Sequence, residues 1–385
     1  NTYPGIACDV PSQVYSYSFA PNAEWSRVFP SGVEIHRYMQ RVAADEGVAQ
    51  HIRFETDVES MRWDDEAERW VCETSAGCYS ADVLVLACGR LSEPNFPDVP
   101  GIDSFAEGAE DRVAMHSARW RHDVDLSGKR VAVVGSGASA IQLVPELAKV
   151  AGQLTLMQRS APYIVPRNDR AYSDAERRMF KRVPEAMAEA RESWFWQQES
   201  VFAQRVLVDS EVAEARRRAL GHLLAQVPDP QMRDRLTPSY EIGCKRVLLS
   251  DTYYPTFSLP HVGLIDSALA AVEPGALISL DGRRVEAELL RHAVAVERLE
   301  GILRQDALLH SARQPYARRV FGDDGRLLSD EWADGMYGYA SIAVPGFPNL
   351  FVMNGPNAGL GHNSAIVMIE SQIEYIRQAL AQMRE

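Results

Sequence analysis

Residues 130–140 read RVAVVGSGASA, an apolar run that leads straight into a G-x-G-x-x-A turn. The spacing of apolar residues in the next stretch, 141–147, predicts a helix. A strand, a glycine turn and a helix in this order are typical of a βαβ unit in which a dinucleotide pyrophosphate approaches bare backbone at the positive end of the helix. A tight turn that binds nothing is the alternative, and the position of the glycines favours binding. The predicted binding residues are Gly135, Ser136, Gly137, Ala138, Ser139 and Ala140.

The residues about 20 positions after the glycines separate the two nicotinamide dinucleotides. NAD requires a carboxylate there for the ribose hydroxyls, whereas NADP requires an arginine for its additional phosphate. The chain has no acid at this point and has Arg159 followed by Ser160. A planar guanidinium suits bidentate phosphate contact, so the pattern predicts NADP rather than NAD. The alternative is that Arg159 is an ordinary exposed arginine.

Length and charge limit the class of protein. A chain of 385 residues with 46% hydrophobic residues is long enough for two cores, because single domains usually stop growing at about 250 to 300 residues. The 53 acidic and 40 basic residues give a formal net charge of -13, which repels nucleic acid and anionic lipid. No apolar run reaches the roughly 20 residues that a membrane span needs. A small-molecule partner is therefore predicted, with neither nucleic acid nor membrane.

The cysteines indicate the redox environment. All five are outside any C-x-x-C pair and their number is odd, so neither a zinc site nor a disulfide framework is predicted. A reducing cytoplasm fits this usage best, and no metal is expected.

The periodicity of apolar residues divides the chain into three parts. We expect residues 1–125 to form the N-terminal part of one domain and 126–255 to form a second domain with a helical insertion at about 171–236. Residues 256–385 are expected to complete the second domain and return to the first. The predicted elements are a helix at 32–49, strands at 52–54, 58–63, 70–74, 79–87, 264–265, 277–280 and 350–353, and a closing helix from about Ser364. The end of the fourth strand, 83–87, is expected to be buried.

Four separated segments carry longer motifs. They are NTYPGIACDVPS at 1–12, ACGRLS at 87–92, GCKR at 243–246 and GPNAGLGHNS at 355–364. In this order they resemble segments of the Baeyer-Villiger monooxygenases, class B flavoprotein monooxygenases related to the flavin-containing monooxygenases.

This resemblance implies a fold and an activity. The fold is α/β, with two Rossmann-like doubly wound dinucleotide-binding domains, one for FAD and one for NADP, and with the FAD domain assembled from both ends of the chain. In the family, NADPH reduces FAD, the reduced flavin forms a flavin peroxide with O2, and a ketone becomes an ester or lactone. The implied cofactors are FAD and NADP, and the implied substrates are a ketone and O2. Neither the individual ketone nor the oligomeric state follows.

The resemblance also implies roles for single residues. Arg246 matches the arginine that stabilises the anionic peroxide, and Asp9 matches the aspartate that pairs with it. A fixed guanidinium aimed at developing negative charge is strong electrostatic catalysis. Taken alone, Asp9 fits a turn cap and Arg246 a surface ion-pair partner equally well. The remaining implied cofactor contacts are Lys245 at the 2'-phosphate, Cys8 and Tyr15 on the flavin side, and Asn357.

His116 and Trp120 reproduce the H-x-x-x-W half of a family fingerprint that precedes the NADP turn. Glu110 and Arg112 stand where the other half has phenylalanine and glycine. We expect His116 to be a residue of the domain linker that relays cofactor movement. A packed, hydrogen-bonded histidine is the alternative.

Two stretches depart from the family pattern. Relatives open with a strand and a G-x-G-x-x-G turn for the ADP half of FAD, and residue 1 falls after that segment, so we expect an incomplete FAD domain. Residues 286–296 resemble a helix more than the strand that relatives carry. Glu286 to Arg319 is therefore expected to be an insertion, a degenerate stretch or a sequence error.

Other functions stay open at this level. One is oxidation of nitrogen or sulfur by the heteroatom-oxidising relatives. Another is a catalytically inactive NADP-binding fragment. A flavin-free NADP dehydrogenase is less favoured, because the chain has no Tyr-x-x-x-Lys arrangement for hydride chemistry.

Overall fold

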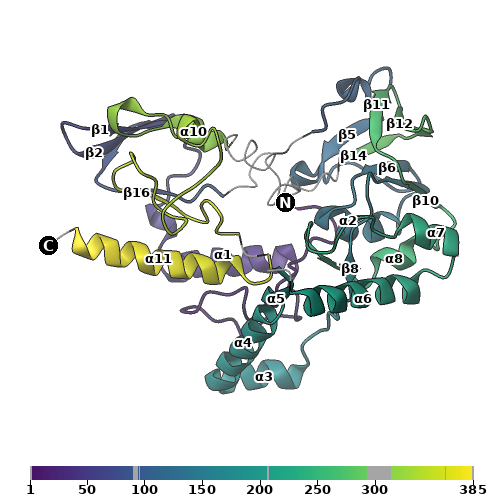
Figure 1. The fold of residues 1–385 in the computed structure, drawn as a ribbon, viewed down its shortest axis with the longest axis horizontal. Coiled ribbons are helices and arrows are strands. Elements are labelled where there is room, and N and C mark those ends of the chain that lie inside the picture. Colours follow the sequence, from purple (N-terminus) through teal and green to yellow (C-terminus); the bar gives the residue numbers. More distant parts are fainter. Residues whose placement is uncertain are drawn as a thin grey trace.

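The computed structural model describes residues 2–89, 94, 96–205, 208–292, 314–359 and 361–383. Figure 1 shows two lobes, one built around β6 and α2 and the other around β1 and β16, with α1 and α11 running beneath the second. Of the sequence motifs, Asn1, residues 90–92 and Leu360 lie outside the described residues.

The first lobe, called here the nucleotide lobe, contains a five-stranded parallel sheet in the order β10-β7-β6-β14-β5. Its central strand β6 is buried along Val131–Val134, as expected for a parallel strand covered on both faces. The helix α2 packs its apolar residues into the same core. The βαβ prediction is confirmed by β6 (Arg130–Val134), α2 (Ala138–Leu147) and β7 (Gln153–Met157), and the sheet is completed by β5 (Val113–His116), β10 (Val262–Ile265) and β14 (Leu289–His292).

The strand β14 corrects the helix predicted at 286–296. It lies between β5 and β6 and pairs with both, and Leu289 and Leu290 are 2% and 0% exposed. Hydrogen bonding on both edges and burial of two leucines outweigh the helix propensity of this stretch. Residues 293–296 of the predicted helix, and 293–313 of the predicted insertion, lie outside the described residues.

A small antiparallel sheet covers one end of the nucleotide lobe. Its strands are β11 (Leu269–Glu273), β12 (Ala276–Ser279) and β13 (Arg284–Glu286). The strand predicted at 277–280 therefore begins one residue earlier, and that at 264–265 is part of β10. Short 3-10 helices, η2 (Ile102–Ser104) and η3 (Ser117–Arg119), flank β5.

The second lobe holds a four-stranded sheet in the order β15-β1-β2-β3 and a separate parallel pair, β16 with β4. Trp70 and Trp332 are fully buried in its core. The bounds are β1 (Val58–Asp64), β2 (Arg69–Thr74), β3 (Gly77–Ala81), β4 (Leu84–Leu86), β15 (Val320–Phe321) and β16 (Leu350–Val352), with η4 (Pro315–Arg319), η5 (Asp323–Gly325) and α10 (Leu328–Glu331) beside them.

Two strand predictions in this lobe need correction. The strand predicted at 79–87 is broken at residues 82–83 into β3 and β4, and Val85 is 43% exposed rather than buried. Residues 52–54 form no strand; they follow α1 (Gly32–Asp45) and η1 (Ala49–His51), and Ile52 and Phe54 are 46% and 71% exposed. The pattern of apolar residues predicts a strand but not its partner. Among the described residues, no strand pairs with 52–54.

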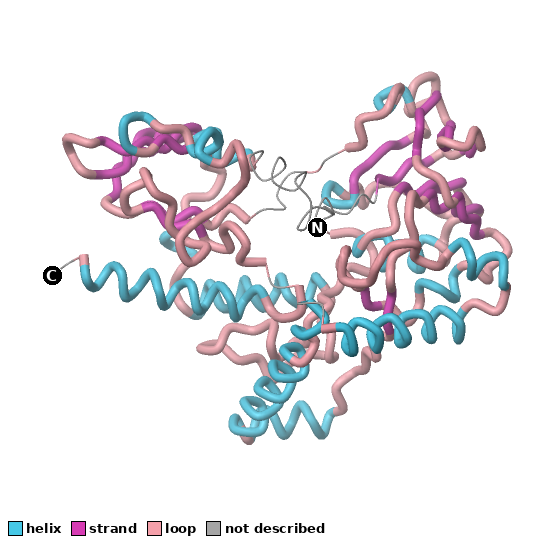
Figure 2. Tube along the Cα trace, viewed as in Figure 1, coloured by secondary structure: helices cyan, strands magenta, loops and turns pink. Residues whose placement is uncertain are grey.

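Between the short paired strands β8 (Ile164–Val165) and β9 (Leu248–Leu249), the described chain is mainly helical from Asp174 to Arg235, in agreement with the helical insertion predicted at about 171–236 (Figure 2). Ser173 and Glu176 form a capping box at the start of α3. After β9 comes α8 (Tyr253–Thr256), and the chain closes with α11 (Ala365–Gln382), close to the predicted start; Ser364 caps it. The insertion helices are α3 (Asp174–Arg182), α4 (Pro184–Glu199), α5 (Phe202–Arg205), α6 (Asp209–Gln226) and α7 (Pro230–Arg235).

Candidate functional site

The glycine turn joins β6 to α2 with the geometry that an anion needs. Gly135 has φ 101°, a left-handed conformation that favours glycine, and its N–H donates to the carbonyl oxygen of Met157 at 2.8 Å. Gly137 caps α2 without a side chain, and the first turn of α2 contains no acidic residue. The positive end of this helix is therefore not neutralised by a carboxylate of its own, which suits a pyrophosphate.

The end of β7 lies against this turn. The Ser136 hydroxyl donates to the carbonyl oxygen of Ser160 at 3.0 Å, and the Lys245 ammonium donates to the Ser160 hydroxyl at 2.9 Å. The Lys245 ammonium also lies 4.7 Å from the centre of the Tyr240 ring. Arg159 is exposed beside Ser160. The structure thus brings two cations to the strand end where the sequence predicted a phosphate contact.

Asp9 and Arg246 form an ion pair between the N-terminal segment and the loop that precedes β9. Their side chains are 25% and 38% exposed, so the pair is partly exposed and does not lie in a dry core. Lys245 and Arg246 are consecutive, and one contacts Ser160 while the other contacts Asp9. Two neighbouring residues therefore connect the predicted NADP phosphate contact to the predicted catalytic pair.

The predicted flavin-side residues Cys8 and Tyr15 lie around Asp9. Burial, followed by the nearby Asp9 charge, raises the pKa of the Cys8 thiol to about 12. Burial also raises the pKa of Tyr15 to about 12, with smaller contributions from Cys8 and Asp9. Both groups therefore stay protonated at neutral pH and add no negative charge beside Arg246.

The N-terminal segment is anchored on α2. The Tyr3 hydroxyl donates to the Gln142 side-chain oxygen at 2.9 Å, and the Gln142 amide donates back to the Ala7 carbonyl oxygen at 2.9 Å. Tyr3 is 5% exposed and belongs to the core of the nucleotide lobe. Gly5 has φ +80°, and a Cβ there would lie 2.7 Å from the Gln142 carbonyl oxygen. The segment that carries Asp9 is thus packed against the helix of the glycine turn.

The other predicted residues lie in different surroundings. His116 ends β5, is 1% exposed and accepts a hydrogen bond at Nδ1 from the Ala118 N–H at 3.1 Å. Its ring meets Phe96 edge to face at 5.5 Å, and Trp120 packs against the nucleotide-lobe core. This agrees with the packed-histidine alternative and leaves the relay role a prediction. Asn357 is exposed with φ 60°, in the loop between β16 and α11.

Three charged residues that the sequence did not single out hold this region together. The Arg191 guanidinium, on α4, donates to the carbonyl oxygens of Gln13 and Ser16 at 2.7 Å each. Glu370, on α11, accepts from the Ser18 N–H at 2.6 Å and from Arg191 at 3.5 Å. Arg167 donates to the Cys8 carbonyl oxygen. Their partners are far away in the sequence and no local motif marks them, so a single sequence contains no signal for these contacts.

The loop that holds Asn357 is also tied to the insertion. Glu199, at the end of α4, accepts from the Asn363 amide at 2.5 Å and lies 3.2 Å from Nε2 of His362. His362 in turn packs against the Phe202 ring at 5.3 Å between ring centres.

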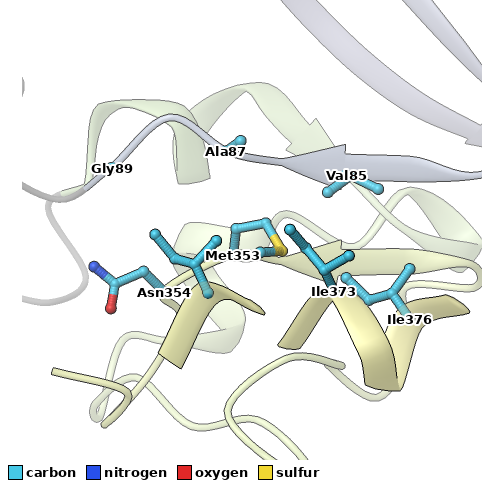
Figure 3. A pocket seen from close by; sticks show the side chains of 8 residues that line it. Val85, Ala87, Gly89, Met353, Asn354, Ile373 and Ile376 are labelled. Atoms are coloured by element: carbon cyan, nitrogen blue, oxygen red, sulfur yellow. The ribbon is translucent and has the colours of Figure 1, made fainter. Parts of the chain in front are cut away.

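A pocket of about 450 Å³ lies elsewhere, in the second lobe (Figure 3). Its side chains are mostly apolar and come from β4, from the residues after β16 and from α11. None of the predicted site residues lines it. The lining residues are Val85, Ala87, Gly89, Met353, Asn354, Ile369, Ile373 and Ile376.

Within the described ranges, none of the helices combines the length and apolar character that crossing a bilayer requires. The same part of the chain contains no group of three or more His, Cys, Asp or Glu side chains arranged to hold a metal ion.

Known proteins resemble the chain over nearly its whole length. A family model described as pyridine nucleotide-disulphide oxidoreductase matches residues 8–190. A Baeyer-Villiger monooxygenase of Streptomyces coelicolor is 42% identical over 387 residues, which cover 100% of this chain and 70% of the relative. A Baeyer-Villiger monooxygenase of Pseudomonas aeruginosa is 38% identical, again with 100% and 70% covered. The solved structure of an oxidized steroid monooxygenase bound to NADP matches with a TM-score of 0.84 at 29% identity, over 99% of this chain and 77% of that one.

Proposed function

The chain belongs to the Baeyer-Villiger monooxygenases, and from this premise we propose that Asp9 and Arg246 form the catalytic centre at which it converts a ketone to an ester or lactone. The family is one of NADP- and FAD-dependent oxidoreductases, and two Rossmann-like domains are the fold of its solved members. The observation that supports the proposed centre is the placement of Lys245 and Arg246, consecutive residues that contact Ser160 and Asp9 respectively.

The described residues fit NADP. A left-handed glycine, a helix start without a carboxylate and two cations at the end of β7 match a pyrophosphate and a 2'-phosphate in charge and in donors. We propose that Gly135 to Ala140 hold the pyrophosphate, and that Arg159, Ser160 and Lys245 hold the 2'-phosphate.

The described residues also fit the ring side of FAD. Cys8 and Tyr15 flank Asp9 as neutral groups, and Asn357 lies on the loop that Glu199 fixes through its contacts with Asn363 and His362. When bound, FAD would supply the redox chemistry that passes electrons from NADPH to O2, and O2 would be the source of the oxygen atom that enters the substrate. We propose that Cys8, Tyr15 and Asn357 contact it.

The protein contributes orientation and charge. Arg246 presents a guanidinium whose direction is set by Asp9, so that positive charge is already in place where negative charge develops at the reacting oxygen atoms. The charge of Asp9 also keeps the guanidinium from turning toward bulk water. Because the pair is partly exposed, we expect the bound cofactors and ketone to exclude the water that screens it.

We also propose the domain boundaries at 125/126 and 255/256. In this division residues 1–125 and the end of the chain contribute to the FAD domain, except for β5, which pairs with β14 in the nucleotide-lobe sheet. A cytoplasmic location is supported by the five cysteines, all of which are free thiols. A small-molecule ketone and O2 are the proposed partners.

The test uses the purified chain incubated with FAD and then freed of excess flavin. We expect a visible flavin band, and NADPH oxidation that rises with added ketone and forms ester. Arg246→Ala in the same assay is expected to keep the band and lose the ester. Sulfoxide or N-oxide without ester would support the heteroatom-oxidising alternative, and colourless protein that still binds NADPH would support the NADP-binding fragment.

A further inference from the structure

Arg167 follows β8 and directs its guanidinium into the N-terminal segment. Its Nη2 donates to the Cys8 carbonyl oxygen, and the guanidinium lies 5.0 Å from the centre of the Phe29 ring. Its own backbone is fixed, because its N–H donates to Asp251 at 2.8 Å. One side chain therefore connects the nucleotide lobe to the residue that precedes Asp9.

Arg167 is a charged side chain held in a largely buried position. Burial lowers its pKa, and the charges of Asp169 and Asp9 only partly compensate. Its Nε is buried without a hydrogen-bond partner, and Asp169 also forms an ion pair with Arg27 at 2.7 Å. The backbone at Cys8 is also held by a second hydrogen bond, because the Cys8 N–H donates to the Pro30 carbonyl oxygen at 2.9 Å. Burying a cation with an unsatisfied N–H costs folding free energy. This cost indicates a functional reason to keep Arg167 at this position, beyond holding the backbone at Cys8.

The contact acts on a specific peptide plane. The Cys8 carbonyl and the Asp9 N–H belong to the same planar peptide unit, so a donor that fixes the carbonyl also fixes the direction in which the Asp9 residue leaves that plane. Asp9 carries the carboxylate that holds Arg246. Arg167 therefore constrains the peptide plane from which the Asp9 residue continues.

We propose that Arg167 is a positioning residue for the proposed reaction: by holding the Cys8 carbonyl oxygen it orients Asp9, which in turn orients Arg246. This inference rests on the proposed function of the Asp9 and Arg246 pair. Arg167 does not contact the substrate in this scheme and acts only through Asp9.

The test compares Arg167→Met with Arg167→Lys, which keeps the charge and one donor. A matched control is Arg319→Met, because Arg319 also donates to a distant backbone carbonyl, that of Val58, but in the second lobe. A charged hydrogen bond of ordinary strength predicts that Arg167→Met lowers kcat for ketone oxidation about tenfold, with the KM for NADPH changed less than about twofold. We expect Arg167→Lys to restore most of kcat, and Arg319→Met to leave it unchanged.

A second measurement does not depend on flavin. The rate at which iodoacetamide alkylates Cys8, followed by peptide mapping, reports how firmly the segment is held. The Cys8 thiol has a pKa of about 12 and is partly buried, so it should react slowly. We expect faster alkylation of Cys8 in Arg167→Met and the original rate in Arg319→Met.

A double-mutant cycle separates the outcomes. If Arg167 acts through Asp9, Arg167→Met combined with Asp9→Asn should be no slower than Asp9→Asn alone. Additive losses, or Arg167→Met with unchanged kcat while Arg246→Ala is inactive, would overturn the positioning role and leave the proposed function standing. A fully active Arg246→Ala would instead overturn the proposed function. Should Arg167→Met not fold, Arg167→Gln takes its place in every arm.

Discussion

The carboxylate of Asp9 contacts the guanidinium of Arg246 across 237 positions of sequence. The two residues meet because the N-terminal segment is packed on α2 through Tyr3 and Gln142, and because the loop before β9 returns to the same edge of the nucleotide lobe. Neither residue is held by its own local structure alone. The ion pair is therefore a product of the tertiary fold, and substitutions at either end should affect chemistry rather than folding.

Arg246→Ala tests the chemistry directly. We expect ester formation to fall about 100-fold or more, the range seen when a preorganised donor is removed from an active site. NADPH binding should change little, because Lys245 and Arg159 remain. Steady-state kinetics with a ketone, together with a titration of NADP binding, provide the two readings. Undiminished ketone oxidation by the variant would remove Arg246 from the mechanism.

Arg159→Ala tests the choice of cofactor. Loss of a guanidinium contact to phosphate should raise the KM for NADPH about tenfold to 100-fold. The KM for NADH should stay nearly the same, because NADH has no 2'-phosphate. A suitable control is Arg121→Ala, since Arg121 is exposed and pairs with Asp123 at 2.6 Å. An equal rise in the KM for NADPH and for NADH would mean that Arg159 does not contact the 2'-phosphate.

Gly5→Ala tests the docking of the N-terminal segment. Gly5 combines φ +80° with a Cβ position 2.7 Å from a carbonyl oxygen, whereas Gly282 has φ +84° and open space around it. Alanine should lower the free energy of unfolding by about 1 kcal/mol at Gly282, from backbone strain alone, and by about 3 kcal/mol at Gly5. Urea unfolding of both variants measures the difference. Equal effects would show that the clash with Gln142 is relieved without cost.

Glu176 predicts a pH dependence of stability. Hydrogen bonds from Arg170 and then from the Ser173 backbone lower its pKa from 4.5 to about 2. A lowered pKa in the folded state means that its contribution is complete above about pH 4.5 and is lost as the pH falls towards about pH 2. Because Glu176 lies at the surface, we expect Glu176→Gln to lower the free energy of unfolding by only about 1 kcal/mol at pH 7.

Urea unfolding of Glu176→Gln from about pH 7 to about pH 3 should show the difference from the unchanged protein shrinking with acid. The exposed Glu192 provides the control substitution, Glu192→Gln. A difference that stays constant over this range would contradict the assigned cause.

The parts of the fold that follow a strong local period could be predicted from the sequence. The strand, turn and helix at 130–147 and the helical insertion are of this kind. Residues 289–292 could not be assigned, because their helix propensity is local while the pairing of β14 with β5 and β6 is not. The candidate site divides in the same way. Motifs pointed to Asp9 and Arg246, whereas Arg167 and Arg191 donate to backbone carbonyls that no sequence pattern marks.

The two attachments of the N-terminal segment have a mechanical consequence. Near Tyr3 and Ala7 the segment is fastened to α2, and near Ser16 and Ser18 it is fastened to α4 and α11. The stretch between them is also held within its length, where Cys8 contacts Pro30 and Arg167. A rotation of α11 relative to α2 would therefore strain this segment, and Asp9 lies within it. A movement between the lobes would therefore change the geometry of the ion pair between Asp9 and Arg246.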